Sequence, residues 1–516
     1  MSLIKATATV GSFTLLSRVV GFIRECLMAS LLGAGMCADA LLVALRLANT
    51  FRRIFAEGAF NASFLPRFSR ILNNEGREKA NVVLVDVFWI LLFMTIAFSL
   101  VVMIFYPSIL LVIVSGFDVL SEKFRLTTGL GRLCFPYLVF ISTASLLAGV
   151  LNSVGKFALP AITHSLMSLF SILGLLVGYY LELSNGGVVY LLSCLVLLSG
   201  VAQLIVLYIS VRHHGFRLAF HWRWSRPVRD IMKNMIPGIL GAGVWQLNIL
   251  IDTMVSSHFP TGSITCINLA DRLVQFPLGT LGIAFSTVLL PTLAKHMGAE
   301  EYDRASAALR ESVLTSSFFS LGATALLLAL AQETVAVAFQ RGLFQQDQVR
   351  ITAETLVGLT VGLPAFMLTK IFSSLYFANG DTKTPVFFGI CSIIVNLIGL
   401  VLLVPFNRYM GIAMGTSLSA VANAFLLLYF APRNVRIKND KEFKAKILSQ
   451  LCAAIGVYLL VNRLSGIFWR AEMGSQSVKW LVYMAIALVG AAVFCLITFL
   501  GHFLTGRRYR RRFRRF

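Results

Sequence analysis

The sequence predicts an all-α polytopic membrane protein with about fourteen transmembrane helices, and three observations support this fold class. Of its 516 residues, 57% are hydrophobic and only 13% are charged, whereas a soluble domain carries about 25% charged residues. Apolar stretches of about 20 residues recur, and each is long enough to cross a hydrocarbon core of about 30 Å as a helix. These stretches are continuously apolar, whereas outer-membrane strands alternate and are about ten residues long.

The first half of the chain contains six predicted spans, which are 8–32, 37–64, 82–106, 126–151, 160–181 and 187–210. Within the third span, 88–106 is continuously apolar. The first two are unusual, because charged side chains interrupt their apolar runs. A long basic segment, 212–233, follows the sixth span.

The second half contains six further predicted spans, which are 234–256, 264–293, 313–331, 351–378, 385–405 and 410–431. A second basic segment, 433–446, separates them from a final pair of spans at 447–462 and 480–503. The last two spans therefore stand apart from the other twelve.

The distribution of basic residues predicts the orientation. The net charge of +22 would suggest nucleic-acid binding in a soluble protein, but here most Lys and Arg lie in alternate loops. These segments are Lys5, 67–79, Lys156, 212–233, 295–310, Lys383, 433–446 and 507–515. Because cytoplasmic loops carry the Lys and Arg excess, we expect a multi-pass protein of the bacterial inner membrane with both termini in the cytoplasm. We expect the tail 507–516 to contact anionic membrane lipid rather than nucleic acid.

Two short matches indicate an internal duplication. L-P-R-F-S-R at 65–70 resembles L-P-T-L-A-K at 290–295, and N-S-V-G-K-F-A-L-P at 152–160 resembles F-A-N-G-D-T-K-T-P at 377–385. Both matches have the same offset. An even number of spans in each repeat gives two lobes of the same orientation, as in two-lobed transporters. The expected organisation is an N-terminal lobe (1–211), a basic linker (212–233), a C-terminal lobe (234–432), and two extra spans with a basic tail (433–516).

No motif points to a metal, a cofactor or an enzyme. The eight Cys occur singly without a C-x-x-C pair, and the seven His show no ligand spacing. The sequence has no P-loop, G-x-S-x-G or H-E-x-x-H motif. We therefore expect neither a catalytic residue nor a metal site, and no bound cofactor.

The first two spans carry charges that a bilayer normally excludes. Each such Arg or Asp costs about 2.5–3.5 kcal/mol to insert, so these residues normally face a hydrated interior and serve function. The set is Arg18, Arg24, Glu25, Asp39, Arg46, Arg52, Arg53 and Glu57.

Helical periodicity places part of this set on one face. At 100° per residue, Asp39, Arg46, Arg53 and Glu57 fall within about 40° of one another, which predicts a stripe facing away from lipid. Arg18 and Arg24 share a cavity only if the first span bends, and Gly21 is the candidate bend.

These charges either pair with one another or form an anion site. Arg53 and Glu57, at i and i+4, are equally well explained as a structural pair. The arginines outnumber the acids, however, so some guanidinium groups are left without an acid. In a hydrated cavity such groups bind anions, and their forked donors match phosphate oxygens. The second half adds Asp271, Arg272 and Lys370.

Two polar residues keep alternative interpretations. Asp252, midway along the seventh span, could bind a coupling cation or make a structural hydrogen bond. Asn49 could line the cavity or bond to a neighbouring helix.

Four sequence blocks resemble the MurJ (MviN) family of lipid II flippases, in the multidrug/oligosaccharidyl-lipid/polysaccharide exporter superfamily. They are S-R-V-V-G-F-I-R-E (17–25), G-A-G-M-C-A-D-A (33–40), F-R-R-I-F-A-E-G-A-F (51–60) and A-D-R-L-V-Q-F-P-L-G-T-L-G-I-A (270–284). The resemblance covers residues from near the N-terminus to at least 430.

The resemblance implies that the chain moves lipid II, the undecaprenyl-diphosphate-linked peptidoglycan precursor, from the cytoplasmic to the periplasmic leaflet by alternating access. It implies a cavity between the lobes lined by arginines that match Arg18, Arg24, Arg52 and Arg272. It also implicates an acid matching Asp39 and a lysine matching Lys370. The two extra spans would form a groove for the polyprenyl tail.

The sequence departs from the family pattern at two positions. Gln275 stands where an acid is expected beside Arg272, and Arg46 stands where Lys is expected. The first change puts a proton-coupling role for that acid in doubt. Coupling to an ion gradient or to the membrane potential stays open, with Asp39, Glu57 and Asp252 as the acids to test.

Three alternatives compete with a lipid-diphosphate flippase. A cation-coupled exporter of drugs or other polyprenyl-linked saccharides would need carboxylates in excess in its cavity. A polyprenyl-phosphate glycosyltransferase would need acidic metal-binding loops, whereas these loops are short and basic. A scaffold of the division or elongation machinery would leave the membrane arginines unexplained.

Overall fold

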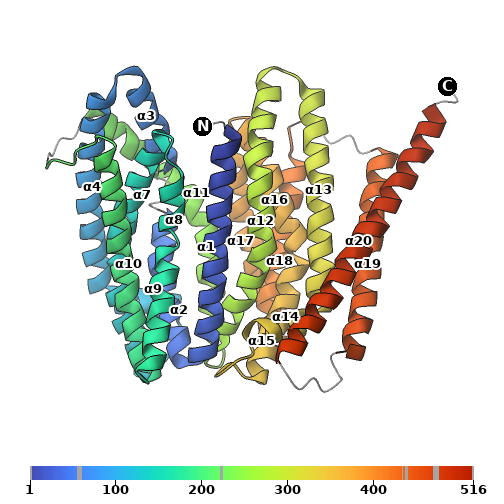
Figure 1. Ribbon diagram of the computed structural model, residues 1–516, viewed down its shortest axis with the longest axis horizontal. Coiled ribbons are helices and arrows are strands. Elements are labelled where there is room, and N and C mark those ends of the chain that lie inside the picture. Colours follow the sequence, from blue (N-terminus) through green and yellow to red (C-terminus); the bar gives the residue numbers. More distant parts are fainter. Residues whose placement is uncertain are drawn as a thin grey trace. The chain divides into compact units, whose positions relative to one another are not determined.

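In the computed structural model, residues 3–54, 61–220, 225–432, 434–435, 440–468 and 476–513 are described, and every regular element among them is a helix (Figure 1). This confirms the predicted all-α fold class. By length and composition, nine described helices can cross a membrane, or ten when α15 (Gln346–Val361) and α16 (Leu363–Ala378), which meet at a 42° bend, count as one span. The other four predicted spans are also helical over most of their length, so fourteen spans are compatible with the structure.

The chain forms two compact units. Unit 1 comprises Met1–Thr265 with Arg341–Phe344, and unit 2 comprises Cys266–Gln340 with Gln345–Phe516. Unit 1 contains α1 (Leu3–Leu32), α2 (Met36–Arg52), α3 (Asn61–Asn74), α4 (Arg77–Ile104), α5 (Tyr106–Ile113), α6 (Glu122–Cys134), α7 (Tyr137–Ser153), α8 (Ala158–Thr163), α9 (Leu166–Tyr180), α10 (Asn185–His213) and α11 (Arg226–Ser256). Unit 2 contains α15, α16, most of α12 (Ser263–Gly298), α13 (Tyr302–Ala329), α14 (Ala331–Phe339), α17 (Lys383–Leu403), α18 (Arg408–Tyr429), α19 (Lys441–Phe468) and α20 (Gln476–Phe513).

Unit 1 is built around α7, which packs against both α4 and α10 (Figure 1). Its largest core cluster joins the aromatic face of α3 to these helices, and Phe64 and Phe68 of that face are fully buried. The two rings stack with their centroids 5.0 Å apart. Where a helix would otherwise face water, the burial of such aromatic side chains is the largest favourable contribution to the free energy of packing.

The compact units divide the chain differently from the predicted lobes. Helix α11 packs against α3, α4 and α5, and its residues Val228, Ile231 and Met235 are buried in the same core cluster as Phe64. The boundary between units therefore follows Thr265, whereas the predicted boundary is the linker 212–233. The internal duplication itself stays a prediction.

Within the second predicted span, 37–64, residues 55–60 lie outside the described residues. Helix α2 ends at Arg52, and a new helix, α3, begins at Asn61. Helix α3 has an apolar face and a polar face, and Pro66 lies inside it. The apolar residues near 64 therefore lie on the apolar face of α3.

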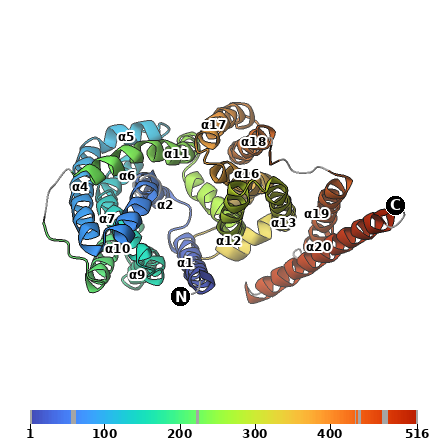
Figure 2. The ribbon, with the colours of Figure 1, turned by 90° about the horizontal axis from the view of Figure 1, so that it is seen from above.

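Unit 2 includes the two extra spans as packed elements. Helix α19 packs along α13 and against α20 (Figure 2). A methyl group at Gly322 of α13 would lie 2.9 Å from the ring of Phe494 of α20, so this glycine lets the two helices approach closely. Gln450 of α19 is fully buried and donates to the carbonyl of Leu314. The extra pair is thus a fixed part of unit 2.

The surfaces of the long helices are apolar. Exposed side chains include Ile104 on α4, Val401 and Leu402 on α17, and Leu481 and Phe499 on α20. Exposed apolar surface on this scale is unfavourable in water and favourable in lipid. This pattern fits helices whose outward faces contact a bilayer.

The loop before α17 carries an acid at a helix N-terminus. Asp381 accepts hydrogen bonds from the backbone N–H groups of Lys383 and Thr384, both at 3.0 Å. The hydrogen bonds from Thr384 are the main reason why the pKa of Asp381 is lowered from its ordinary value. A carboxylate at this position also interacts favourably with the helix dipole.

Candidate functional site

Among the described charged residues of α1, Arg24 pairs with Glu25 and Arg18 stands apart. Arg24 Nη2 lies 2.6 Å from Glu25 Oε1, and Glu25 is almost fully buried. The Nε of Arg24 is buried and has no hydrogen-bond partner. Arg18 is half-buried and makes neither an ion pair nor a hydrogen bond within the described part of the chain. Helix α1 is continuous through Gly21, and the bend predicted there stays a prediction.

The polar residues of α2 hold one another in place near its end. Arg52 Nε donates to Asn49 Oδ1 at 3.1 Å, which fixes the guanidinium of Arg52. Arg46 Nη1 donates to Thr253 Oγ1 of α11 at 2.5 Å. The backbone N–H of Arg53 closes the helix by donating to the carbonyls of Asn49 and Thr50.

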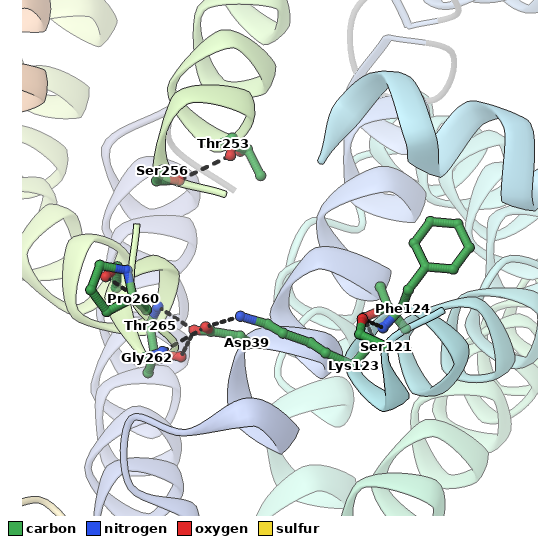
Figure 3. Close-up of polar contacts among 11 residues, drawn as sticks. Asp39, Ser121, Lys123, Phe124, Thr253, Ser256, Pro260, Gly262 and Thr265 are labelled. Carbon is green, nitrogen blue, oxygen red and sulfur yellow. Dashed lines mark hydrogen bonds and ion pairs between the residues drawn. The ribbon is translucent and has the colours of Figure 1, made fainter. Parts of the chain in front are cut away.

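Asp39, in the first turn of α2, is fully buried and has four polar contacts (Figure 3). Its Oδ2 accepts from the backbone N–H of Gly262 at 2.7 Å and lies 2.8 Å from Lys123 Nζ. Its Oδ1 accepts from the N–H and the hydroxyl of Thr265, at 2.9 and 2.7 Å. The carboxylate thus caps the first turn of α12, where the helix dipole favours a negative charge.

Lys123 completes this cluster and was not singled out from the sequence. It lies in the first turn of α6, its side chain is only 13% exposed, and its Nζ lies 4.3 Å from the centre of the Phe117 ring. A basic residue in the first turn opposes the helix dipole. That mismatch is the only sequence signal that could have marked Lys123.

Two glycines allow backbones to meet at the end of α1 and the turn that follows it. Gly262 has φ +96°, and a methyl group there would lie 2.3 Å from the carbonyl oxygen of Ala34. Gly342 has φ +54°, and a methyl group there would lie 2.2 Å from the carbonyl oxygen of Ser30. The turn between α1 and α2 is therefore enclosed by backbone, and only glycine fits at either contact.

The candidate residues of unit 2 lie on α12 and α16. Gln275 Nε2 donates to Asp271 Oδ2 at 2.5 Å, so the amide at this position serves as a donor to the neighbouring acid. Arg272 is half-buried, and Lys370 of α16 is exposed on the surface of unit 2. A carboxylate at position 275 could not donate this hydrogen bond and would repel the carboxylate of Asp271.

The remaining predicted residues are placed as follows. Asp252 is half-buried on α11, next to Thr253. Glu57 lies outside the described residues, and so does its predicted pairing with Arg53. The predicted stripe can therefore be followed only through Asp39, Arg46 and Arg53. Within the ranges that the structure covers, no group of three His, Cys, Asp or Glu could hold a metal ion.

Comparison with known proteins gives consistent similarities. Residues 28–498 match the family model described as "Lipid II flippase MurJ". A probable lipid II flippase of Rickettsia prowazekii is 34% identical over 460 residues, covering 88% of this chain and 89% of the relative. One of Rhizobium meliloti is 36% identical over 429 residues, covering 83% and 80%. The lipid II flippase of Burkholderia cenocepacia is 33% identical over 436 residues, covering 83% of each.

Solved structures share the fold. A lipid II flippase in an inward closed conformation superposes with a TM-score of 0.77 at 21% identity, covering 94% of this chain and 98% of that one. An inward-facing multidrug transporter of the MATE family gives a TM-score of 0.69 at 13% identity, covering 82% and 96%. At these identities the superpositions establish the fold.

Proposed function

The chain belongs to the MurJ family of lipid II flippases, and from this premise we propose that the arginines of α1 and α2 hold the diphosphate of lipid II during its passage. The protein is a lipid II flippase for cell-wall synthesis and not an enzyme. It is a multi-pass membrane protein. We propose that it resides in the bacterial inner membrane with both termini in the cytoplasm, because the basic loops alternate with the less basic ones.

Arg18 is the observation that carries the proposed role. A guanidinium in a helix of a membrane protein is costly unless water, an acid or a ligand solvates it. Arg18 is half-buried and has no acid or hydrogen-bond partner among the residues that the structure describes. The diphosphate of lipid II carries negative charge that hydrocarbon cannot solvate, and a guanidinium fork matches phosphate oxygens. We therefore assign Arg18 to the headgroup of the substrate.

Arg24 and Arg52 are the partners that we propose for Arg18 in unit 1. Glu25 fixes one end of Arg24, and Asn49 fixes Arg52 through its Nε. Arg24 keeps a donor for a ligand, because a guanidinium has five N–H groups and its buried Nε has no hydrogen-bond partner among the described residues. Held side chains lose less entropy when a ligand binds. Arg272 and Lys370 are the corresponding candidates in unit 2.

We propose a second role for Asp39, which is to hold the turn between α1 and α2 against the start of α12. Its carboxylate joins α2, α6 and α12 through Lys123, Gly262 and Thr265. In an alternating-access cycle these contacts would form in one state and separate in the other. Because Asp39 is fully buried, it is a poor site for a ligand in the conformation seen here. The hydrogen bond from Arg46 to Thr253 would stabilise the position of the same face of α2.

The direction of transport, from the cytoplasmic to the periplasmic leaflet, requires a source of free energy. Equal affinity for the substrate in both states would shift no equilibrium. An ion gradient or the membrane potential could supply the bias, and Asp252 and Glu57 are the acids that we propose to test. The excess of arginines over acids in α1 and α2 argues against a cation-coupled drug exporter of the same superfamily.

Replacement of Arg18 tests the proposed substrate contact. Arg18→Ala should fail to support growth of a strain depleted of its own flippase, whereas Arg18→Lys should retain partial function because it keeps the charge. Lipid II should accumulate in the inner leaflet, measured by its accessibility to an externally added modifying enzyme. Arg350→Ala is the matched control, because Arg350 is 79% exposed.

Membrane levels of each variant must match those of the parent protein. Full growth and normal lipid II accessibility with Arg18→Ala would remove the proposed contact. Equal loss with Arg350→Ala would show that the effect is not specific to Arg18.

A further inference from the structure

The segment after α10 turns back along α4 before α11 begins. Helix α10 ends at His213, and Gly215 adopts a left-handed conformation with φ +85° that reverses the chain. We refer to residues 214–220 as the strap. Within it, Arg217 donates its N–H to Asn81 Oδ1 at 2.9 Å and accepts from Asn81 Nδ2 at 3.2 Å. Trp89 Nε1 donates to the carbonyl of Ala219 at 3.0 Å.

The strap lies beside the N-terminal part of α4 and reaches the apolar run of that helix. The apolar run of α4 begins near Val82, and Trp89 lies about 12 Å beyond Asn81 along the helix axis. Trp indoles favour the boundary between headgroups and hydrocarbon. Irregular backbone is tolerated at that depth only when its polar groups have partners. Asn81 and Trp89 provide such partners for the strap, which explains how an extended segment can lie there.

The strap and α4 together form a surface that is apolar on one side. Phe220 is 68% exposed, and its ring centre lies 5.0 Å from that of Trp89. Phe93, one turn further along α4, is also exposed, and its ring lies 6.0 Å from Trp89. These three rings form a continuous aromatic face beside the apolar run of α4.

The other side of this surface is basic. Arg217 and Arg77 are both exposed, and the guanidinium of Arg77 lies 5.7 Å above the ring of Phe216. In the part of the chain that the structure describes, neither arginine makes an ion pair with an acid. Nearby Glu75 is engaged with Lys79 at 3.4 Å. The basic side therefore lies toward the N-terminal end of α4, about two to three helical turns from Trp89, where lipid headgroups would be.

We propose that the strap and the adjoining face of α4 bind a phospholipid with an anionic headgroup. Arg217 and Arg77 contact the phosphate and the additional negative charge of the headgroup, and Phe220 and Phe93 contact the acyl chains. The order of charge and apolar surface matches the order of groups in such a lipid. A zwitterionic lipid would gain the same apolar contacts but a weaker interaction with the two guanidinium groups. This inference does not depend on the transport function.

Lipid retention tests the basic side of the site. The full-length protein, purified in mild detergent and given equal amounts of phosphatidylglycerol and phosphatidylcholine, should retain several-fold more phosphatidylglycerol in native mass spectrometry. The double variant Arg77→Gln with Arg217→Gln should lose this preference. The double variant Arg304→Gln with Arg350→Gln is the matched control, because these arginines are 70% and 79% exposed elsewhere. An unchanged preference in the strap variant, or an equal loss in the control, would overturn the proposal.

A second measurement needs no substitution and locates the lipid. Amide hydrogen exchange of peptides covering 214–220 should be several-fold slower in nanodiscs of phosphatidylglycerol than in nanodiscs of phosphatidylcholine. The turn at 299–302 serves as the internal control and should exchange equally in both. Equal exchange of the strap in the two lipids would show that no anionic lipid binds there, whatever the retention experiment gives. Phe220→Ala should lower retention of both lipids, whereas Phe406→Ala, at a residue 90% exposed, should not.

Discussion

The buried pair of Asp39 and Lys123 allows a quantitative test of the closed contact. Asp39→Ala would leave the Lys123 ammonium, 13% exposed, without its acid, and would remove the acceptor of three further hydrogen bonds. Removing one partner of a buried ion pair costs about 3–5 kcal/mol. Lys123→Met should cost less, about 1.5–3 kcal/mol, because the carboxylate keeps its donors from Gly262 and Thr265.

The double variant separates the pair from the rest of the site. If the two side chains interact as the 2.8 Å distance indicates, the cost of Asp39→Ala with Lys123→Met should be lower than the sum of the single costs. The expected coupling is about 1–3 kcal/mol. The free energy of unfolding in mixed micelles, followed by tryptophan fluorescence, measures all three variants. Lys79→Met, at a side chain 69% exposed, is the control and should change stability by about 1 kcal/mol or less.

Additive effects of the two substitutions, within about 0.5 kcal/mol, would refute the reasoning. They would mean that Lys123 reaches water and that the carboxylate is stabilised by its hydrogen bonds alone. The role proposed for Asp39 in the transport cycle would then have to rest on the start of α12.

Three further outcomes are expected. Gln275→Glu places a second carboxyl group against Asp271, so one of the two carboxyl groups must be protonated. Transport in proteoliposomes should therefore gain a dependence on pH near neutrality. An unchanged pH profile would contradict this expectation. Asp381→Ala should lower the free energy of unfolding by about 1 kcal/mol at neutral pH. Because the pKa of Asp381 is lowered in the folded protein, the variant should show its whole loss of stability above the ordinary carboxyl pKa. This loss should disappear as the pH falls through the lowered pKa, and unfolding measured as a function of pH can check it. Gly262→Ala should destabilise more than Gly76→Ala, because both glycines have positive φ but only the first faces an atom 2.3 Å away; equal shifts in unfolding midpoint would mean that backbone strain alone matters.

The sequence predicted the class of fold because its signal is local. A run of about 20 apolar residues identifies a membrane helix without knowledge of its neighbours. Within the second span, 37–64, the same local signal does not separate the apolar residues of α2 from those of the amphipathic helix α3. It also could not assign α11 to unit 1, since that assignment depends on Val228, Ile231 and Met235 meeting the face of α3.

The candidate site was predicted in its residue types more than in its contacts. Arg18, Arg24 and Asp39 stood out because charges in apolar runs are costly wherever they point. Periodicity placed Asp39 and Arg46 on one face of α2, yet it could not reveal that Asp39 accepts hydrogen bonds from Gly262 and Thr265. Those partners lie far away in sequence, and the direction of a backbone N–H is set by the turn that precedes α12.

The sequence by itself thus determined the helical membrane fold, the excess of arginines in the first two helices and the family resemblance, because each follows from composition or from short local strings. Only the tertiary structure decided which charges are neutralised. Lys123 meets Asp39 because packing brings α6 and α2 within hydrogen-bond distance, whereas Gln275 meets Asp271 one turn away on the same helix, a local contact that the spacing of the two residues already allows. Arg18 keeps no such neighbour in the described residues. Hydrogen bonds and ion pairs act over a few ångströms, so the folded arrangement of the chain determines them.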